Sequence, residues 1–434
     1  MSQLPRLKLV ASLALILSIS LLLNGCASTA EGITRALLDN SEDKHPRQCF
    51  VTGPAFGGID DIGETGVATP KTLRAILVHG IGSHEVGWST ALQQRLSAML
   101  GLNTFDTEVK NIQLASGKFP GEALGRLLVT RAYDKETGDQ LISYEVTWSE
   151  ITEPMKKKLA YDTSAYYRDK RAEFNHNMKV FLNDRLLDPV AYLGSANAKI
   201  RASASEALCF TLMGDWRSLP ATGEAECNLD AGVDLTNIVD DQLIFITHSL
   251  GSRIVTDALQ TEIAEVRERL DSVDVAAGKK ADLREILEAI QQKHVAFYMM
   301  ANQLPLIDAA LPAPRIVDQF ADYCEAGGKF YDQRIFAGLR VVAFSDPNDT
   351  LSYGLPFNYA NTAMDSRLCP RLTNVIVNTT DVISPLGIIE MAAPLESHSG
   401  YLQDSIVLQV MADGIGTDVM TPEVAEKCEW VNIE

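Results

Sequence analysis

One stretch of the chain decides the fold: residues 243–253 read Leu-Ile-Phe-Ile-Thr-His-Ser-Leu-Gly-Ser-Arg. The apolar run 243–246 is typical of a strand that is buried on both faces, as strands in parallel sheets are. Helix-compatible residues follow from Ser252, so we expect a sharp turn from strand into helix around Ser249. Such a turn presents a serine hydroxyl at the edge of a sheet, and Gly251 lets the helix approach the strand closely. A serine between a strand and a helix is also a common N-cap, so this stretch alone leaves both interpretations open.

Further runs of strand length lie on both sides of this stretch, and most are separated by segments with helical periodicity. Strands separated by helical segments indicate an α/β fold, with a mostly parallel central sheet that helices cover on both faces. The expected strands are 73–78, 141–148, 242–247, 294–300, 339–344 and 372–378, and the expected helices are 88–99, a helix from 252, and 262–293.

Residues 151–236 interrupt this alternation with two helical patterns, over 155–183 and 200–213. We interpret 151–236 as a helical insertion in a main domain of residues 71–434. It is either a cap over a site or a solvated structural insert, and the sequence does not choose between them. Residues 26–70 are expected to be a tether and an irregular edge of the domain, because they are polar and rich in glycine.

The N-terminus has the parts of a secretory signal over residues 1–25: a basic start, a short apolar run and small residues before a break. Leu23-Asn24-Gly25-Cys26 resembles the lipobox of bacterial lipoproteins, in which the cysteine is lipidated and becomes the new N-terminus. This resemblance implies a bacterial envelope protein held on a membrane through Cys26. Because Ala27 rather than aspartate follows Cys26, we expect the outer membrane, facing the periplasm. The alternative is an ordinary cleaved signal, which would leave a soluble periplasmic protein.

Composition excludes some classes of function. The 434 residues include 38 basic and 57 acidic side chains, and a formal charge of −19 disfavours general nucleic-acid binding. Six cysteines remain besides Cys26, an even number that makes disulfides plausible in an exported chain. Six cysteines allow 15 pairings; only Cys209 and Cys227 are close enough in sequence to hint at one. No cysteine or histidine spacing predicts a metal site.

Four short motifs together resemble the α/β-hydrolase family, specifically its lipase- and esterase-like serine hydrolases. They are the turn around Ser249, the loop 79–82 (His-Gly-Ile-Gly), the segment 346–349 (Asp-Pro-Asn-Asp) and a late histidine, His398. Thr247 departs from the family pattern, because glycine is commonest at that position. The motifs follow one another in the family's order of nucleophile, acid and histidine.

The resemblance implies a role for each of these residues. Ser249 would be the nucleophile and His398 its base, with Asp349 as the acid that orients the imidazole and Asp346 as the alternative acid. The backbone N–H groups of Ile81 and Leu250 would form the oxyanion hole. The implied activity is hydrolysis of a carboxylic ester, of a lipid or a small acyl group, through an acyl-enzyme on Ser249 and without a cofactor.

Two further questions stay open at this point. The chain could keep the hydrolase fold and serve without catalysis as an envelope binding or assembly partner, because fold does not establish activity. Several neighbours also have two interpretations: His248 is expected to shape the turn, while His84, Trp88 and the 166–167 tyrosine pair could line a substrate pocket or simply pack.

Overall fold

The computed structural model describes residues 49–59, 71–106, 108–213, 215–228, 235–272, 274–384, 391–416 and 420–432. The predicted signal, Cys26 and most of the predicted tether lie outside these ranges. No helix within them is both long enough and apolar enough to cross a bilayer.

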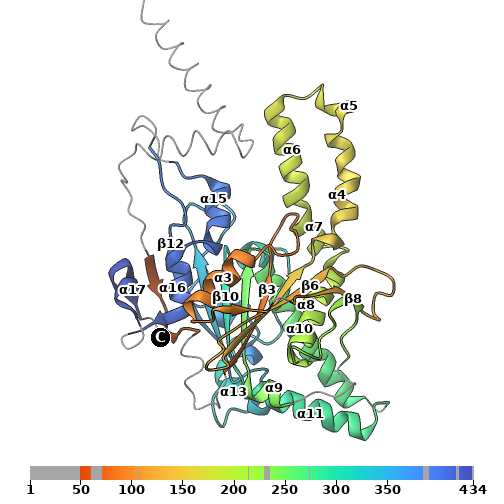
Figure 1. Cartoon of the computed structure of the whole chain (residues 1–434), viewed down its shortest axis with the longest axis vertical. Helices are drawn as coiled ribbons and strands as arrows, with labels where there is room; N and C mark the ends of the chain where they lie inside the picture. The colour runs from red at the N-terminus through yellow and green to blue at the C-terminus, as the bar shows by residue number, and fades with distance from the viewer. Residues whose placement is uncertain are drawn as a thin grey trace, which may run out of the picture.

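The centre of the molecule is a mixed, mostly parallel sheet (Figure 1), which confirms the α/β class. Its strand order is β14-β1-β12-β11-β10-β9-β3-β7-β6-β5-β8, with β4 paired to β6. The run from β12 to β7 is entirely parallel, whereas β6 pairs antiparallel with both β7 and β5, and β1 pairs antiparallel with β12. The strands are β1 (Cys49–Thr52), β2 (Phe56–Gly57), β3 (Thr72–Val78), β4 (Thr104–Phe105), β5 (Lys110–Leu114), β6 (Arg126–Tyr133), β7 (Gln140–Thr147), β8 (Thr222–Ala225), β9 (Gln242–His248), β10 (His294–Met300), β11 (Gly338–Ser345), β12 (Pro370–Val377), β13 (Gly414–Ile415) and β14 (Cys428–Val431), with β13 and β2 forming a separate pair.

Two apolar cores lie on the two faces of this sheet, and the central strands contribute to both by alternation. In β9, for example, Phe245 belongs to one core and its neighbours Ile244 and Ile246 to the other. Helices α8, α10 and α11 pack on the first face, and α3 and α16 on the second. The helices are α3 (Thr90–Met99), α4 (Glu153–Leu159), α5 (Ala165–Arg168), α6 (Glu173–Arg185), α7 (Leu187–Tyr192), α8 (Asn197–Met213), α9 (Leu235–Asp240), α10 (Gly251–Asp271), α11 (Ala277–Gln291), α12 (Leu304–Asp308), α13 (Phe320–Cys324), α14 (Tyr359–Ala363), α15 (Pro394–Ser399), α16 (Ser405–Asp413) and α17 (Pro422–Lys427).

The insertion has two parts with different environments. Helices α4, α5 and α6 project beyond the sheet as an arm (Figure 1), and no residue of α6 is fully buried. Helix α8 instead packs on α10, β3 and β7, and its Ala204 and Ala207 are part of a core. The described part of 151–236 is thus mostly helical, but its second half is a structural layer of the domain and contributes strand β8 to the sheet.

Three local expectations are wrong. Residues 49–52 were expected to be irregular but form β1, which is paired on both edges. The segment 394–401 around His398 is typical of a loop in sequence, but His398 lies in the short helix α15. His294 opens an apolar strand run, which predicts a buried or structural histidine, whereas its side chain is exposed.

Three disulfides join all six cysteines outside the N-terminal motif. They are Cys49–Cys428, Cys209–Cys227 and Cys324–Cys369. The first joins β1 to β14 across almost the whole described chain, and the second ties the end of α8 to the segment after β8.

Candidate active site

Ser249 occupies a strained turn between β9 and α10. Its φ is +56°, in the left-handed region that residues with a Cβ seldom adopt, and its backbone N–H donates to the Met300 carbonyl at 2.8 Å. A Cβ on Gly251 would lie 2.3 Å from the Val78 carbonyl oxygen, so only glycine permits this approach of α10 to β3. Strain of this kind persists only where surrounding contacts maintain it, and it is common at functional sites.

Thr247 fits the turn despite replacing the more usual glycine. Its hydroxyl lies 2.9 Å from the Ser252 hydroxyl in the first turn of α10 and donates to the Tyr298 carbonyl at 3.3 Å. The side chain is therefore accommodated by polar contacts on both sides.

The loop after β3 lies directly against Ser249. Strand β3 lies between β7 and β9 in the sheet. The chain adds β7 on one side of β3 and later adds β9 on the other side, so the direction in which strands are added changes between β3 and β9. Ligands of open α/β sheets bind at the carboxyl ends of strands where this change occurs. A Cβ on Gly80 would lie 2.3 Å from the Ser249 Cβ and 2.9 Å from its Oγ, which shows how close the two backbones come.

His398 is paired with Asp349. The imidazole Nδ1 lies 3.0 and 2.9 Å from the two carboxylate oxygens of Asp349, and both side chains are buried. A carboxylate can only accept, so Nδ1 carries the proton and Nε2 is left as the acceptor of the neutral ring. The Leu351 N–H donates to Asp349 at 2.9 Å and fixes the carboxylate from the other side.

Asp346, the alternative acid, has a different set of partners. Its carboxylate accepts from the backbone N–H and the hydroxyl of Thr379, at 2.7 and 3.0 Å, and from the Asn348 N–H at 2.7 Å. Tyr401 connects the two aspartates: its hydroxyl accepts from the Asp346 N–H at 2.6 Å and donates to Asp349 at 3.2 Å. Asp346 thus holds the loop that carries Asp349.

His248, expected to shape the turn, holds His398 in place. Its Nε2 donates to the His398 carbonyl at 2.7 Å, and the two rings meet edge to face with centroids 4.8 Å apart. Burial holds the pKa of His248 well below its ordinary value, with a further lowering from His398. The His248 ring is therefore neutral, and through its hydrogen bond it links the Ser249 turn to His398.

Two atoms at this site lack a hydrogen-bond partner within the described part of the chain: the Ser249 Oγ and the His398 Nε2. Both are buried, and they do not bond to each other. Buried polar atoms are seldom left unpaired in native proteins, and unpaired ones call for a functional or structural explanation. Catalytic hydrogen bonds are often loose without substrate and tighten only in the complex.

The orientation of the 79–82 loop is set by His79. This buried ring accepts from the Trp148 N–H through Nε2 at 3.1 Å and donates from Nδ1 to the Gly80 carbonyl at 2.8 Å. Burial holds the pKa of His79 well below its ordinary value, consistent with this neutral form. Because the peptide is planar and trans, the Ile81 N–H points away from the Gly80 oxygen. Neither this N–H nor that of Leu250 donates to another group of the described residues.

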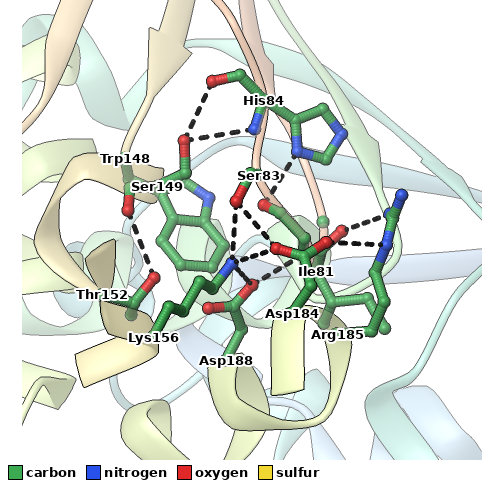
Figure 2. Close-up of polar contacts among 12 residues, drawn as sticks. Ile81, Ser83, His84, Trp148, Ser149, Thr152, Lys156, Asp184, Arg185 and Asp188 are labelled. Carbon is green, nitrogen blue, oxygen red and sulfur yellow. Dashed lines mark hydrogen bonds and ion pairs between the residues drawn. The ribbon is translucent and has the colours of Figure 1, made fainter. Parts of the chain in front are cut away.

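His84 and Trp88, the two residues with open roles, pack against His79. The His84 ring stacks on the His79 ring with centroids 4.1 Å apart. The position of His84 beside the loop is visible in Figure 2, and its Nδ1 donates to the Gly82 carbonyl at 3.1 Å. Burial lowers the pKa of His84 to about 4. Trp88 meets His79 edge to face. The His84 and Trp88 side chains therefore pack against His79 and stabilise the 79–82 loop.

Other candidate places are less suited to chemistry. Across the described ranges, no group of three or more histidine, cysteine, aspartate or glutamate side chains could hold a metal ion. A cavity of about 710 Å³ lies at the opposite edge of the sheet, beside Phe56, Lys293 and Arg340, and neither Ser249 nor His398 lines it. Comparisons with protein-family models, with curated proteins and with solved structures find no match to this chain.

Proposed function

We propose that this protein is a serine hydrolase of the α/β-hydrolase type that cleaves a carboxylic ester through an acyl-enzyme on Ser249. The observation that carries the proposal is the unpaired Ser249 hydroxyl on a left-handed turn next to His248, which donates to the carbonyl of a buried His398 whose Nδ1 is paired with Asp349. The supporting arrangement spans four strand ends: β3, β9, β11 and β12 run parallel and lead into the Gly80, Ser249, Asp349 and His398 segments.

Each group has a defined chemical task in this mechanism. His398 Nε2 takes the proton of the Ser249 hydroxyl as the oxygen attacks the ester carbonyl, because the hydroxyl alone is a poor nucleophile. The tetrahedral oxyanion accepts from the N–H groups of Ile81 and Leu250, each typically worth about 3–4 kcal/mol. His398 then protonates the leaving alcohol, and water repeats the sequence to release the acid. Asp349 holds the imidazole tautomer and stabilises the imidazolium without taking the proton.

Substrate access requires a conformational change. The Ser249 side chain has no exposed surface, and His398 is only 6% exposed. A carbonyl carbon must come within about 3–3.5 Å of the nucleophile to react, so the groups that cover Ser249 must first move apart. Enzymes commonly open and close in this way on the microsecond to millisecond timescale.

The test is hydrolysis of p-nitrophenyl esters of increasing chain length by the parent, Ser249→Ala and His398→Ala proteins. We expect an active parent and two inert variants, with fluorophosphonate labelling of Ser249 in the parent only. Equal rates in all three proteins would end the proposal. A folded parent that is neither labelled nor active, and that copurifies with an envelope protein, would instead support a non-catalytic binding role.

We also propose, from the lipobox-like motif alone, that Cys26 is lipidated and anchors the protein to a bacterial envelope membrane. Several acyl chains, at about 0.8 kcal/mol per buried methylene, would hold the chain firmly on a bilayer. Mass spectrometry of the mature N-terminus tests this: a triacylated Cys26 is expected, and an unmodified N-terminus would contradict it.

A further inference from the structure

A buried ion pair from the insertion lies against the 79–82 loop. Lys156 of α4 and Asp188 of α7 approach within 3.0 Å (Figure 2), Asp188 has no exposed surface and Lys156 is 9% exposed. Removing two charges from water carries an energetic penalty of several kcal/mol per ion, which their attraction offsets only with good geometry and further hydrogen bonds. A buried ion pair therefore contributes little net stability to a fold, and the role of this pair has to be inferred from its other contacts.

Lys156 also lies 3.1 Å from the Asp184 carboxylate and 3.4 Å from the Ser83 hydroxyl, and Asp188 contacts the backbone of the loop. Asp188 accepts from the Gly82 N–H at 2.6 Å through the same oxygen that binds Lys156. Arg185, at the end of α6, donates to the Ile81 carbonyl at 3.0 Å. The peptide unit between Ile81 and Gly82 is therefore held at both its oxygen and its nitrogen, and both partners belong to the insertion (Figure 2).

This peptide unit directly follows the Ile81 N–H. His79 fixes the Gly80 carbonyl before it, and Asp188 and Arg185 fix the peptide after it. Gly82 has a φ of +100°, and a Cβ there would lie 2.4 Å from the Arg185 guanidinium, so the loop is closely fitted to the insertion. The Ile81 N–H belongs to the peptide that joins Gly80 and Ile81, so its direction is set by the contact of His79 with the Gly80 carbonyl and by the held peptide that follows.

We propose that Asp188 and Lys156 are positioning residues that hold the Ile81 N–H in the direction needed to receive the oxyanion. The inference rests on the proposed function, because it assigns the insertion a task in the same reaction. Asp188 makes the contact to the loop, and Lys156 balances its charge and fixes its rotamer. The base of the arm, rather than the sheet, thereby completes the oxyanion hole.

The experiment compares Asp188→Ala, Asp188→Asn and Lys156→Met with the parent in ester hydrolysis. Losing a single oxyanion donor typically lowers kcat by about 100-fold or more. We expect about this loss in kcat for Asp188→Ala, with KM within threefold, because the displaced N–H acts mainly on the transition state. Asp188→Asn keeps an acceptor for the Gly82 N–H and should recover most of the loss, while Lys156→Met should be intermediate.

The matched control is Asp162→Ala. Asp162 lies on the same arm and pairs with Arg171 and Lys179 at 3.2 and 3.3 Å, but it makes no contact with the loop. It should keep kcat within twofold. A general weakening of the arm would instead lower kcat in this variant as well, which would overturn the inference.

A second measurement does not depend on activity. Backbone hydrogen exchange of peptides covering residues 79–85 should be faster in Asp188→Ala and Lys156→Met than in the parent, and unchanged in Asp162→Ala. Unchanged exchange together with full activity in Lys156→Met would refute the positioning role even if Asp188→Ala does not fold. An inactive parent would end the proposed function, and the exchange result would still decide whether the pair holds the loop.

Discussion

Replacing Gly80 by alanine adds one methyl group at the closest approach of the two loops that we assign to catalysis. The new Cβ would lie 2.3 Å from the Ser249 Cβ and 2.9 Å from both its Oγ and the His248 carbonyl oxygen. Optimal separation between carbon atoms is about 3.5–4.0 Å, so the loop and the turn must separate by at least about 1 Å. Both segments are held by hydrogen bonds that oppose this displacement. The Ser249 N–H donates to the Met300 carbonyl, and the Gly80 carbonyl accepts from His79.

Two magnitudes follow from this displacement. Overpacking of this kind typically destabilises a fold by about 1–3 kcal/mol. A misplacement of about 1 Å between reacting groups can lower the rate by about 100-fold. We therefore expect Gly80→Ala to unfold at lower urea concentration and to lose about two orders of magnitude in kcat/KM for p-nitrophenyl esters.

The control is Gly278→Ala in α11, where an added Cβ would meet no atom within 4 Å. This substitution replaces glycine in a helix and should stabilise the protein by up to about 1 kcal/mol while leaving the rate unchanged. A Gly80→Ala protein with the stability and the rate of its parent would refute the close approach on which this reasoning depends.

Three other predictions concern the acid, the covalent links and pH. Asp349→Asn should lower kcat by about 10⁴-fold, as loss of the correct histidine tautomer does, whereas Asp346→Asn should mainly lower the urea midpoint; the opposite ranking in a p-nitrophenyl ester assay would reassign the acid. Replacing both Cys49 and Cys428 by serine should lower the free energy of unfolding by up to about 5 kcal/mol in urea titrations, because the bond closes a very long loop; an unchanged midpoint would contradict this. Burial holds the pKa of His84 at about 4 in the folded protein, below its ordinary 6.5. Unfolded chains therefore bind this proton first, so stability is retained above about pH 6.5 and falls by up to about 3 kcal/mol as the pH drops to about 4. His84→Gln should remove that part of the pH dependence, and an unaltered slope would show that the ring is accessible to protons.

Several parts of the arrangement could be predicted from local sequence. Strands β9 to β12 and β3 are mostly apolar runs, and a buried strand needs little more than such a run with a clear end. The turn at Ser249 is equally local, because the strand, the small residue at 251 and the helix are adjacent in the chain. These features predicted the α/β class and directed attention to Ser249, His398 and the aspartates at 346–349.

Other features were missed because their signal is spread over distant segments. Lys156 lies in a run of lysines that is typical of a solvated helix, and only the fold buries it against Asp188. Tyr401 and His248 likewise acquire their roles from contacts with residues more than fifty positions away. No periodicity marks such residues, since a buried charge and an exposed one have the same local pattern.

By itself, the sequence determined the order of the central parallel strands, the strained turn that carries Ser249, and the six cysteines available for pairing. The tertiary structure alone decided which aspartate meets His398, which cysteines are joined, and that the base of the arm holds the loop after β3. The physical reason is the distance along the sequence over which each signal acts. Backbone preference and hydrophobic periodicity act over a few residues, whereas a hydrogen bond or an ion pair between distant segments exists only after folding has brought them together.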